Sequence, residues 1–199
     1  MKTEIVYKLT DEHMRTYNGY QWVLGEERTF PGKGKLCTSA YAHAYRSPAL
    51  AVLMNPVHAY FSKPRLFRAP AVVERDSGTN LGCTWIRLDC EMELPQVTTV
   101  QRVEFAIRVA SVVYSDPDWQ RWAWRWLTGE DRRLASARAT VYATRAARLA
   151  ADAAADAAAA DVASHAAALA ALAAHAAALA ALAPAEINRI AEDVIGIRA

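Results

Sequence analysis

Excess charge, paired cysteines and leucine-rich apolar runs are all scarce in this 199-residue sequence. Its 23 basic and 21 acidic residues leave a net charge of +2, so no bulk attraction to nucleic acid is expected. The three cysteines lack CxxC spacing, which argues against a thiol-based metal or redox site. No leader segment and no leucine-rich stretch of membrane length is visible, so we expect a cytoplasmic protein without membrane contact.

Several catalytic and ligand-binding motifs are also missing. The chain contains no HExxH pair, no GxGxxG run, no nucleophile elbow and no zinc-finger spacing. The loop Gly32-Lys33-Gly34-Lys35 has amides and ammonium groups suited to a phosphate, but it lacks the spacing of a P-loop. These absences predict no metal and no resident cofactor, and they favour a protein that is not an enzyme.

Alanine is the abundant residue, and it dominates residues 135–183. Because alanine has the highest helix propensity and this tract has no Gly or Pro before Pro184, helix is the expected structure there. The preceding part of the chain holds nearly all the aromatic residues, glycines and prolines. The composition therefore divides the chain into two parts.

Strand patterns occur in the first part. Residues 4–9 alternate between apolar and polar side chains, and residues 65–74 and 83–94 are two further strands expected to pair across the turn 76–80. A short additional strand is expected near residues 28–30.

One short helix is expected between these strands. Ser47-Pro48 has the N-cap and first-position proline that begin helices, and Asn55-Pro56 is expected to end this one.

Further helices follow. Thr98 begins a capping-box pattern, and the helix after it is expected to complete the core of the first part. Asp116-Pro117 begins another helix, on which Trp119, Trp122 and Trp126 share a stripe typical of packing, with a ligand-stacking platform as the alternative. Thr128 has the spacing of a second capping box, from which the alanine-rich helix is expected to start.

These elements predict an α+β fold in three parts. Residues 1–114 form an α+β ligand-binding domain, residues 115–134 a Trp-rich linker helix and residues 135–199 an alanine-rich helical tail. After Pro184 a last short helix carries an apolar side that is expected to dock as a cap.

The tail contains the decad HAAALAALAA twice. On a helix its leucines spread over one broad apolar face that also holds two histidines. We expect this face to make the protein a homo-oligomer, with folding back onto its own domain as the alternative. The predicted oligomerisation residues are His165, Leu169, Leu172, His175, Leu179 and Leu182.

Candidate ligand-binding residues surround the predicted short helix. His43 and His58 flank it, and imidazole titrates near neutral pH, as acid-base or binding groups must. Lys8 and Tyr45 are expected beside the same cleft, and Glu91 lies on a strand with a second carboxylate on its face. The alternative for each histidine is a structural role, and for Glu91 a solvated sheet face.

Several segments together resemble a family of uncharacterised bacterial and phage proteins, whose phage members end in an alanine-rich tail. The segments that carry this resemblance are Tyr7-Lys8, Gly19-Tyr20-Gln21-Trp22, Leu36-Cys37, Tyr41-Ala42-His43-Ala44, Ser47-Pro48-Ala49-Leu50, Arg65-Leu66-Phe67 and Trp126-Leu127-Thr128-Gly129-Glu130-Asp131-Arg132. That family has no established activity.

The first part is also similar to small ADP-ribosyltransferase-like folds, through a strand ending in Tyr-Lys, an aromatic-x-His element and a Glu-bearing strand. In such enzymes a first-strand Arg or His, a Ser or Tyr and a late Glu hold NAD. The resemblance implies these positions for Lys8, which departs from Arg or His, and for Glu91.

The expected function is that of a phage accessory protein of anti-defence type, which binds or sequesters a small nucleotide-like ligand. One alternative is an ADP-ribosyltransferase-like enzyme that uses NAD. Another is an interaction module whose helical tail blocks a host protein.

Overall fold

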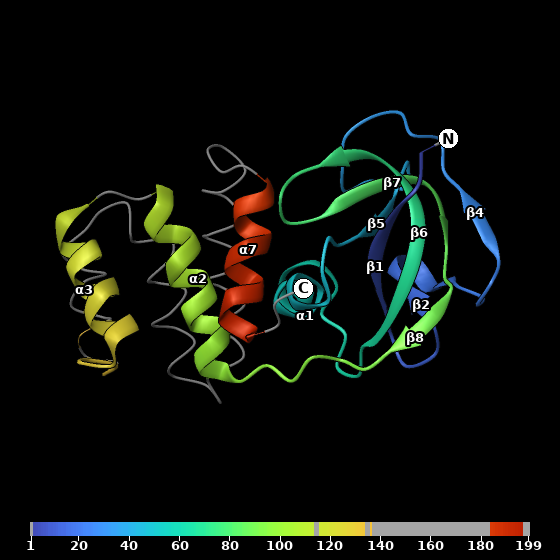
Figure 1. Ribbon diagram of the computed structural model, residues 1–199. Helices are drawn as coiled ribbons and strands as arrows, with labels where there is room; N and C mark the ends of the chain where they lie inside the picture. The colour runs from blue at the N-terminus through green and yellow to red at the C-terminus, as the bar shows by residue number, and fades with distance from the viewer. Residues whose placement is uncertain (1, 114–115, 134–135, 137–183, 197–199) are drawn as a thin grey trace. The chain divides into compact units, whose positions relative to one another are not determined.

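The computed structural model describes residues 2–113, 116–133, 136 and 184–196, and Figure 1 shows their helices and antiparallel strands. The fold is α+β, as predicted. The chain divides into two compact units. Unit 1 comprises Met1–Gln96 together with Ala183–Ala199, and unit 2 comprises Val97–Leu182.

Unit 1 is built on an antiparallel sheet and two helices. Its main strands are β1 (Glu4–Thr10), β4 (Glu27–Thr29), β5 (Ala42–Ala44), β6 (Arg65–Asp76), β7 (Leu81–Arg87) and β8 (Cys90–Met92). A separate two-stranded sheet is formed by β2 (Arg15–Thr16) and β3 (Tyr20–Gln21), which the short 3-10 helix η1 (Tyr17–Gly19) connects. The helices are α1 (Pro48–His58) and α7 (Pro184–Ile195).

Strand pairing in the main sheet runs in a closed circuit. β1 pairs with β6, β6 with β7, and β7 with β5. The backbones of Tyr7 and Tyr45 then exchange two hydrogen bonds of 2.9 and 2.8 Å, which join the residue after β5 back to β1. The sheet therefore encloses an inner face. The buried apolar residues that form this core are Val6, Trp22, Ala42, Ala44, Phe67, Ala69, Ala71, Leu81, Cys83, Ile86 and Leu88.

The predicted first strand is confirmed, and so is the pairing of the two later strands across the turn. The single strand predicted at 83–94 is wrong, because β7 ends at Arg87 and β8 begins at Cys90. Between them, the Leu88 carbonyl accepts the N–H of Gly25 at 2.7 Å, and the Asp89 N–H donates to the Arg68 carbonyl at 2.9 Å. These two bonds do not belong to the regular strand pairing. β7 and β8 nevertheless both pair with β6.

Helix α1 begins as predicted, because the Ser47 hydroxyl accepts the Leu50 N–H and Pro48 occupies the first turn. Its predicted end at Asn55-Pro56 is wrong, since the helix continues through Pro56 to His58. The Asn55 side chain bonds both the N–H and the carbonyl of Phe61, at 3.1 and 2.9 Å, which secures the chain beyond the last turn. The extra turn means that α1 itself carries His58.

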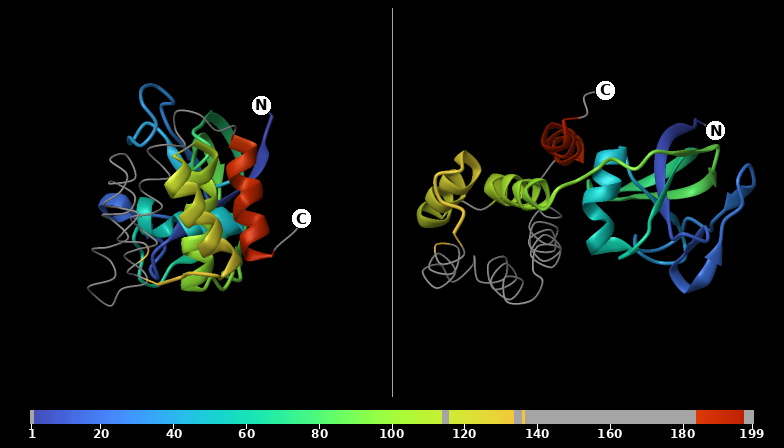
Figure 2. Two further views of the ribbon diagram at one scale, coloured as in Figure 1. Left: turned by 90° about the vertical axis from the view of Figure 1, so that its left-hand side faces the viewer. Right: turned by 90° about the horizontal axis from the view of Figure 1, so that it is seen from below.

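Helix α7 packs against α1, and the two lie side by side in Figures 1 and 2. Its side chains Ile187, Ile190 and Val194 are buried, whereas Arg189 and Asp193 are exposed and paired with each other at 3.1 Å. The predicted docking of the last helix as a cap is confirmed within unit 1.

Unit 2 contains α2 (Thr99–Val113) and α3 (Pro117–Thr128), which pack against each other (Figure 2). Both predicted starts are confirmed: Thr98 and Gln101 cap each other, and the Asp116 carboxylate accepts two N–H groups of the first turn of α3. Trp119 and Trp126 are buried in a cluster with α2, whereas Trp124 is 59% exposed. The packing interpretation of the tryptophan stripe is confirmed.

Two expectations for this region are corrected. α2 groups with α3 rather than with the first core, so the division falls after Gln96 and not at 114. Thr128 does not cap a following helix, because it is the last residue of α3 and its hydroxyl donates to the Arg125 carbonyl at 3.2 Å. Gly129 ends α3 with a φ of 80°, a conformation that glycine adopts at little cost.

Most of the alanine-rich tail lies outside the described residues. The six residues predicted for oligomerisation, between 165 and 182, fall there, so self-association stays a prediction. In the ranges that the structure does describe, no helix is long and apolar enough to cross a membrane.

Candidate ligand-binding pocket

A pocket of about 690 Å³ lies within unit 1, and its lining includes residues of β1, the β2–β3 hairpin, β5 and the end of α1. This volume is within the range of small-molecule sites. Four of the five residues predicted for ligand binding, Lys8, His43, Tyr45 and His58, line it together. They come from β1, β5, the residue after β5 and the last turn of α1.

Lys8 is directed inward by the alternation of β1. Val6, Lys8 and Thr10 share one face of the strand, and all three are buried. The Lys8 Nζ donates to the His43 carbonyl at 2.6 Å and lies 5.1 Å from the centre of the Trp22 ring. Burial lowers the pKa of this amine to about 8, although the neighbouring Cys83 opposes the shift.

The charge of Lys8 has no counterion among the described residues. Lys8 is only 6% exposed, and the His43 carbonyl and the Trp22 indole ring are the partners of its amine. At neutral pH the pKa of about 8 leaves the amine mostly protonated. A buried ammonium without a carboxylate is costly, so an anion entering the pocket would be stabilised there.

His43 is held as a neutral ring. Its Nε2 accepts the backbone N–H of Cys37 at 3.0 Å, which requires that nitrogen to be unprotonated. Burial, and next the nearby Lys8, lower the imidazole pKa to about 4. The side chain thus fixes the Cys37 loop against β5 and adds no charge to the pocket at neutral pH.

Tyr45 and His58 form a stacked pair in the wall. Their rings lie 5.9 Å apart at an angle of 15°, and the Tyr45 hydroxyl is 3.4 Å from Nδ1 of His58. Burial raises the pKa of Tyr45 above its usual value, so its hydroxyl remains neutral. The extra helical turn through Pro56 brings His58 to this position.

Sequence reasoning missed the aromatic wall of the pocket. Tyr20, Trp22 and Phe30 form a cluster whose ring centres are 5.2 to 6.2 Å apart, and the Tyr17 ring at the rim is 87% exposed. The Trp22 indole is anchored by a 2.9 Å bond to the Thr16 hydroxyl. The only signal in the sequence was a Gly-Tyr-Gln-Trp segment in a region without strong strand periodicity.

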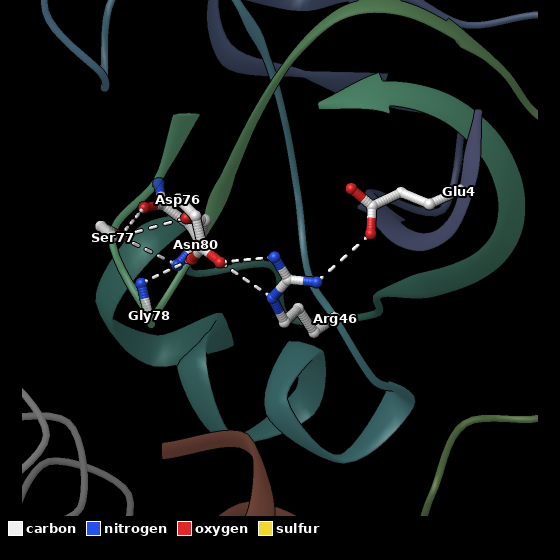
Figure 3. Close-up of polar contacts among 6 residues, drawn as sticks. All are labelled: Glu4, Arg46, Asp76, Ser77, Gly78 and Asn80. Carbon is white, nitrogen blue, oxygen red and sulfur yellow. Dashed lines mark hydrogen bonds and ion pairs between the residues drawn. The ribbon is translucent and has the colours of Figure 1, made fainter. Parts of the chain in front are cut away.

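The turn between β6 and β7 supplies Asn80, another lining residue that the sequence did not single out. As Figure 3 shows, Ser77 bonds Asn80 within this turn, and Asp76 accepts the Gly78 N–H at 2.7 Å. Asn80 then donates to the Cys37 sulfur at 3.6 Å.

Arg46 secures this turn from outside the pocket. Its guanidinium donates twice to Asp76, at 2.9 and 2.6 Å, and once to Glu4 at 3.3 Å (Figure 3). These bonds join the approach to α1, the end of β6 and the start of β1. The network positions Asn80 without itself lining the pocket.

Glu91, the fifth predicted residue, is not placed with the other four. It lies exposed on β8 and pairs through both carboxylate oxygens with Arg65, at 2.8 and 2.6 Å. Hydrogen bonding to Arg65 holds the pKa of this carboxyl below its usual value. Its place in the structure fits the alternative interpretation, a solvated sheet face.

The described lining contains one lysine, two histidines and no carboxylate. Within the described part of the chain, no three His, Cys, Asp or Glu side chains are grouped to hold a metal ion. No model of a protein family, no curated protein and no solved structure matches this chain.

Proposed function

We propose that unit 1 binds a small nucleotide-like ligand in this pocket and holds it without reacting it. The observation that carries the proposal is the buried Lys8 ammonium, which lies beside aromatic rings and has no carboxylate partner in the described structure. A phosphate supplies the missing negative charge, and a base supplies a flat face for the rings.

The energetics favour such a ligand. A charge-assisted hydrogen bond contributes roughly 1.5–3 kcal/mol, and stacking of a base on an aromatic ring contributes about 1–3 kcal/mol. Lys8 Nζ lies 5.1 Å from the centre of the Trp22 ring, and the neighbouring Tyr20, whose ring centre is 5.2 Å from that of Trp22, is 38% exposed and accessible to a base. Together the two interactions contribute roughly 2.5–6 kcal/mol before the cost of association, which favours a ligand that carries both a phosphate and a base over one that carries either alone.

Binding is favoured over ADP-ribosyl transfer because of the carboxylate. Such a reaction needs a glutamate at the ribose, and the candidate, Glu91, pairs with Arg65 away from the pocket lining. Sequestration of a ligand is the role of an anti-defence accessory protein, and we extend the proposal to that role and to a phage origin. A host-blocking role for the tail stays a prediction, because the tail lies outside the described residues.

The test is retention of ligand by the full chain. The protein is incubated with a mixture of nucleotides and NAD, separated from unbound material, heated, and the released compounds are identified by mass spectrometry. We expect an intact nucleotide. Released nicotinamide would support the enzyme instead, and no retained compound would contradict binding.

A pair of matched variants locates the site. Lys8→Met removes the buried charge, and Lys2→Met removes the same charge from an exposed position ahead of the same strand. We expect Lys8→Met to weaken binding about ten- to a hundredfold and Lys2→Met to leave it unchanged. Equal affinities for the two variants would place the ligand elsewhere.

A further inference from the structure

We infer that the preferred ligand is a nucleotide whose phosphate carries a single negative charge, the chemistry of a cyclic mononucleotide. This inference rests on the proposed function and adds the charge class of the ligand. It follows from one buried ammonium set against an aromatic wall in a pocket whose described lining has no other lysine or arginine and no carboxylate.

The charge count comes from the lining itself. Lys8 is the one lysine or arginine among the described residues that line the pocket, and no aspartate or glutamate is among them. His43 is neutral, because its Nε2 accepts the Cys37 N–H. His58 is the other lining imidazole, and its Nδ1 faces the Tyr45 hydroxyl at 3.4 Å. Lys8 is therefore the one ammonium or guanidinium group in the described lining, and no carboxylate there offsets its charge.

Each phosphate charge beyond the first lacks a partner in such a site. A terminal phosphate carries roughly −1.5 to −2 at neutral pH, because its second pKa is about 6. The excess charge must lose its water without gaining a cation, which is unfavourable in a partly enclosed pocket. A cyclic phosphodiester has no second ionisable oxygen, so its single charge matches Lys8.

The aromatic wall fits the same compact shape. Lys8 Nζ is 5.1 Å from the Trp22 ring, and the Trp22 and Tyr20 rings are 5.2 Å apart. Tyr20 is 38% exposed whereas Trp22 is 3% exposed, so the accessible stacking surface lies one ring away from the ammonium. This short separation suits a ligand whose phosphate is tied back to its own ribose beside the base. Stacking accepts every base, so adenine and guanine compounds should bind with similar affinity.

The test is calorimetric titration of the full chain with 3′,5′-cyclic AMP, AMP and ATP, repeated with the guanine series. We expect cyclic AMP to bind most tightly, AMP less tightly, and ATP at least about tenfold more weakly than cyclic AMP. Lys8→Met should weaken binding of cyclic AMP about ten- to a hundredfold, and Lys2→Met should leave it unchanged.

A pH series on the unmodified protein tests the charge match by changing the charge of the ligand. Lowering the pH from about 7.5 to about 5.5 protonates AMP, whose second phosphate pKa is about 6, but leaves cyclic AMP unchanged. AMP should therefore gain affinity relative to cyclic AMP. His43, with a pKa lowered to about 4, stays neutral over this range. A protonated His58 would attract the more highly charged AMP more strongly, so the series is repeated with His58→Gln, in which the relative gain of AMP should persist.

The outcomes separate the two proposals. If AMP or ATP binds more tightly than cyclic AMP, or if the ratio does not move with pH, the single-charge inference is overturned while nucleotide binding stands. If cyclic AMP binds Lys8→Met as well as the unmodified protein, the inference is overturned because the charge match is not at Lys8. If no nucleotide of either series binds, the proposed function itself fails.

Discussion

Trp22 in unit 1 and Trp119 in unit 2 are each 3% exposed, yet their surroundings differ in kind. Trp119 packs against apolar neighbours, including Ile107 of α2 and Trp122, whose ring centre is 5.9 Å away. Trp22 packs into the core of the sheet but also faces the Lys8 ammonium and lines the pocket. Equal burial thus accompanies two roles, and the neighbours of the ring, not its exposure, distinguish a packing residue from a candidate binding residue.

The largest expected effect tests the packing side of this comparison. Trp119→Ala should lower the free energy of unfolding of unit 2 by about 3–5 kcal/mol, because it removes a large buried ring. Denaturant titration followed by helical circular dichroism measures this loss. Nucleotide affinity should remain within about twofold, since the pocket residues all belong to unit 1.

Trp124→Ala is the matched control, because Trp124 lies on the same helix but is 59% exposed. Its stability should change by less than about 0.5 kcal/mol. If Trp119→Ala abolished nucleotide binding while unit 1 stayed folded, the separation of packing and binding roles between the units would be wrong.

Lys8→Met tests the binding side, and it should stabilise the protein while weakening ligand binding. Burial lowers the pKa of this amine from 10.5 to about 8, so below pH 8 the folded state bears the full cost of the buried charge. We expect the variant to gain about 1–3 kcal/mol in free energy of unfolding at neutral pH, measured by denaturant titration.

The pH dependence gives this prediction a second readout. Between pH 8 and 10.5 the unfolded chain binds more protons at residue 8 than the folded chain, so stability of the unmodified protein should rise across that window. Lys8→Met should lack this rise. A variant that is less stable than the parent would mean that the Lys8 bond to the His43 carbonyl matters more than the buried charge.

His43 predicts an acid-sensitive contribution of smaller size. Its pKa is lowered from 6.5 to about 4, so between these values the unfolded chain takes up a proton that the folded chain excludes. Stability should therefore fall as the pH drops from 6.5 to 4. Because the ring is partly exposed, this contribution is discounted to about 1–2 kcal/mol.

The variant His43→Gln isolates this contribution from other histidines, because an amide oxygen can still accept the Cys37 N–H but does not titrate. Denaturant titrations of both proteins at several pH values give the difference. If the free energy of unfolding depended on pH in the same way for parent and variant, the folded state would not exclude a proton from His43, as its place between Lys8 and the Cys37 loop implies that it does.

The smallest effect is expected at Glu91. Its pair with Arg65 is exposed, and such pairs contribute little, so Glu91→Gln should change the free energy of unfolding by less than about 0.5 kcal/mol. Calorimetric titration should find ligand affinity unchanged. If the parent protein released nicotinamide from NAD and Glu91→Gln did not, the transferase alternative would be favoured over sequestration.

Local sequence patterns correctly predicted the start of each helix that is capped by a neighbouring side chain. The N-caps at Ser47 and Asp116 and the capping box at Thr98 all begin helices, because capping uses side chains within four residues of the helix start. The alternation of β1 was likewise readable. The end of α1 was not, because Asn55-Pro56 has the local pattern of a helix end, whereas in the structure the Asn55 side chain bonds the Phe61 backbone beyond the turn that contains Pro56.

The sequence by itself determined the α+β class, the strand that carries Lys8 and the packing role of the tryptophan stripe, because periodicity and composition decide which side of an element is buried. Only the tertiary structure decided which polar residues meet. Lys8 and His43 are 35 residues apart in sequence, and strand pairing around a closed sheet brings them within a hydrogen bond. The pairing of β8 with β6 gives Glu91 the partner Arg65, 26 residues away. The pairing of strands that are distant in sequence leaves no local sequence pattern. Residue type alone therefore suggested Lys8 and Glu91 equally as ligand-binding groups, and only their neighbours in the structure distinguish the two.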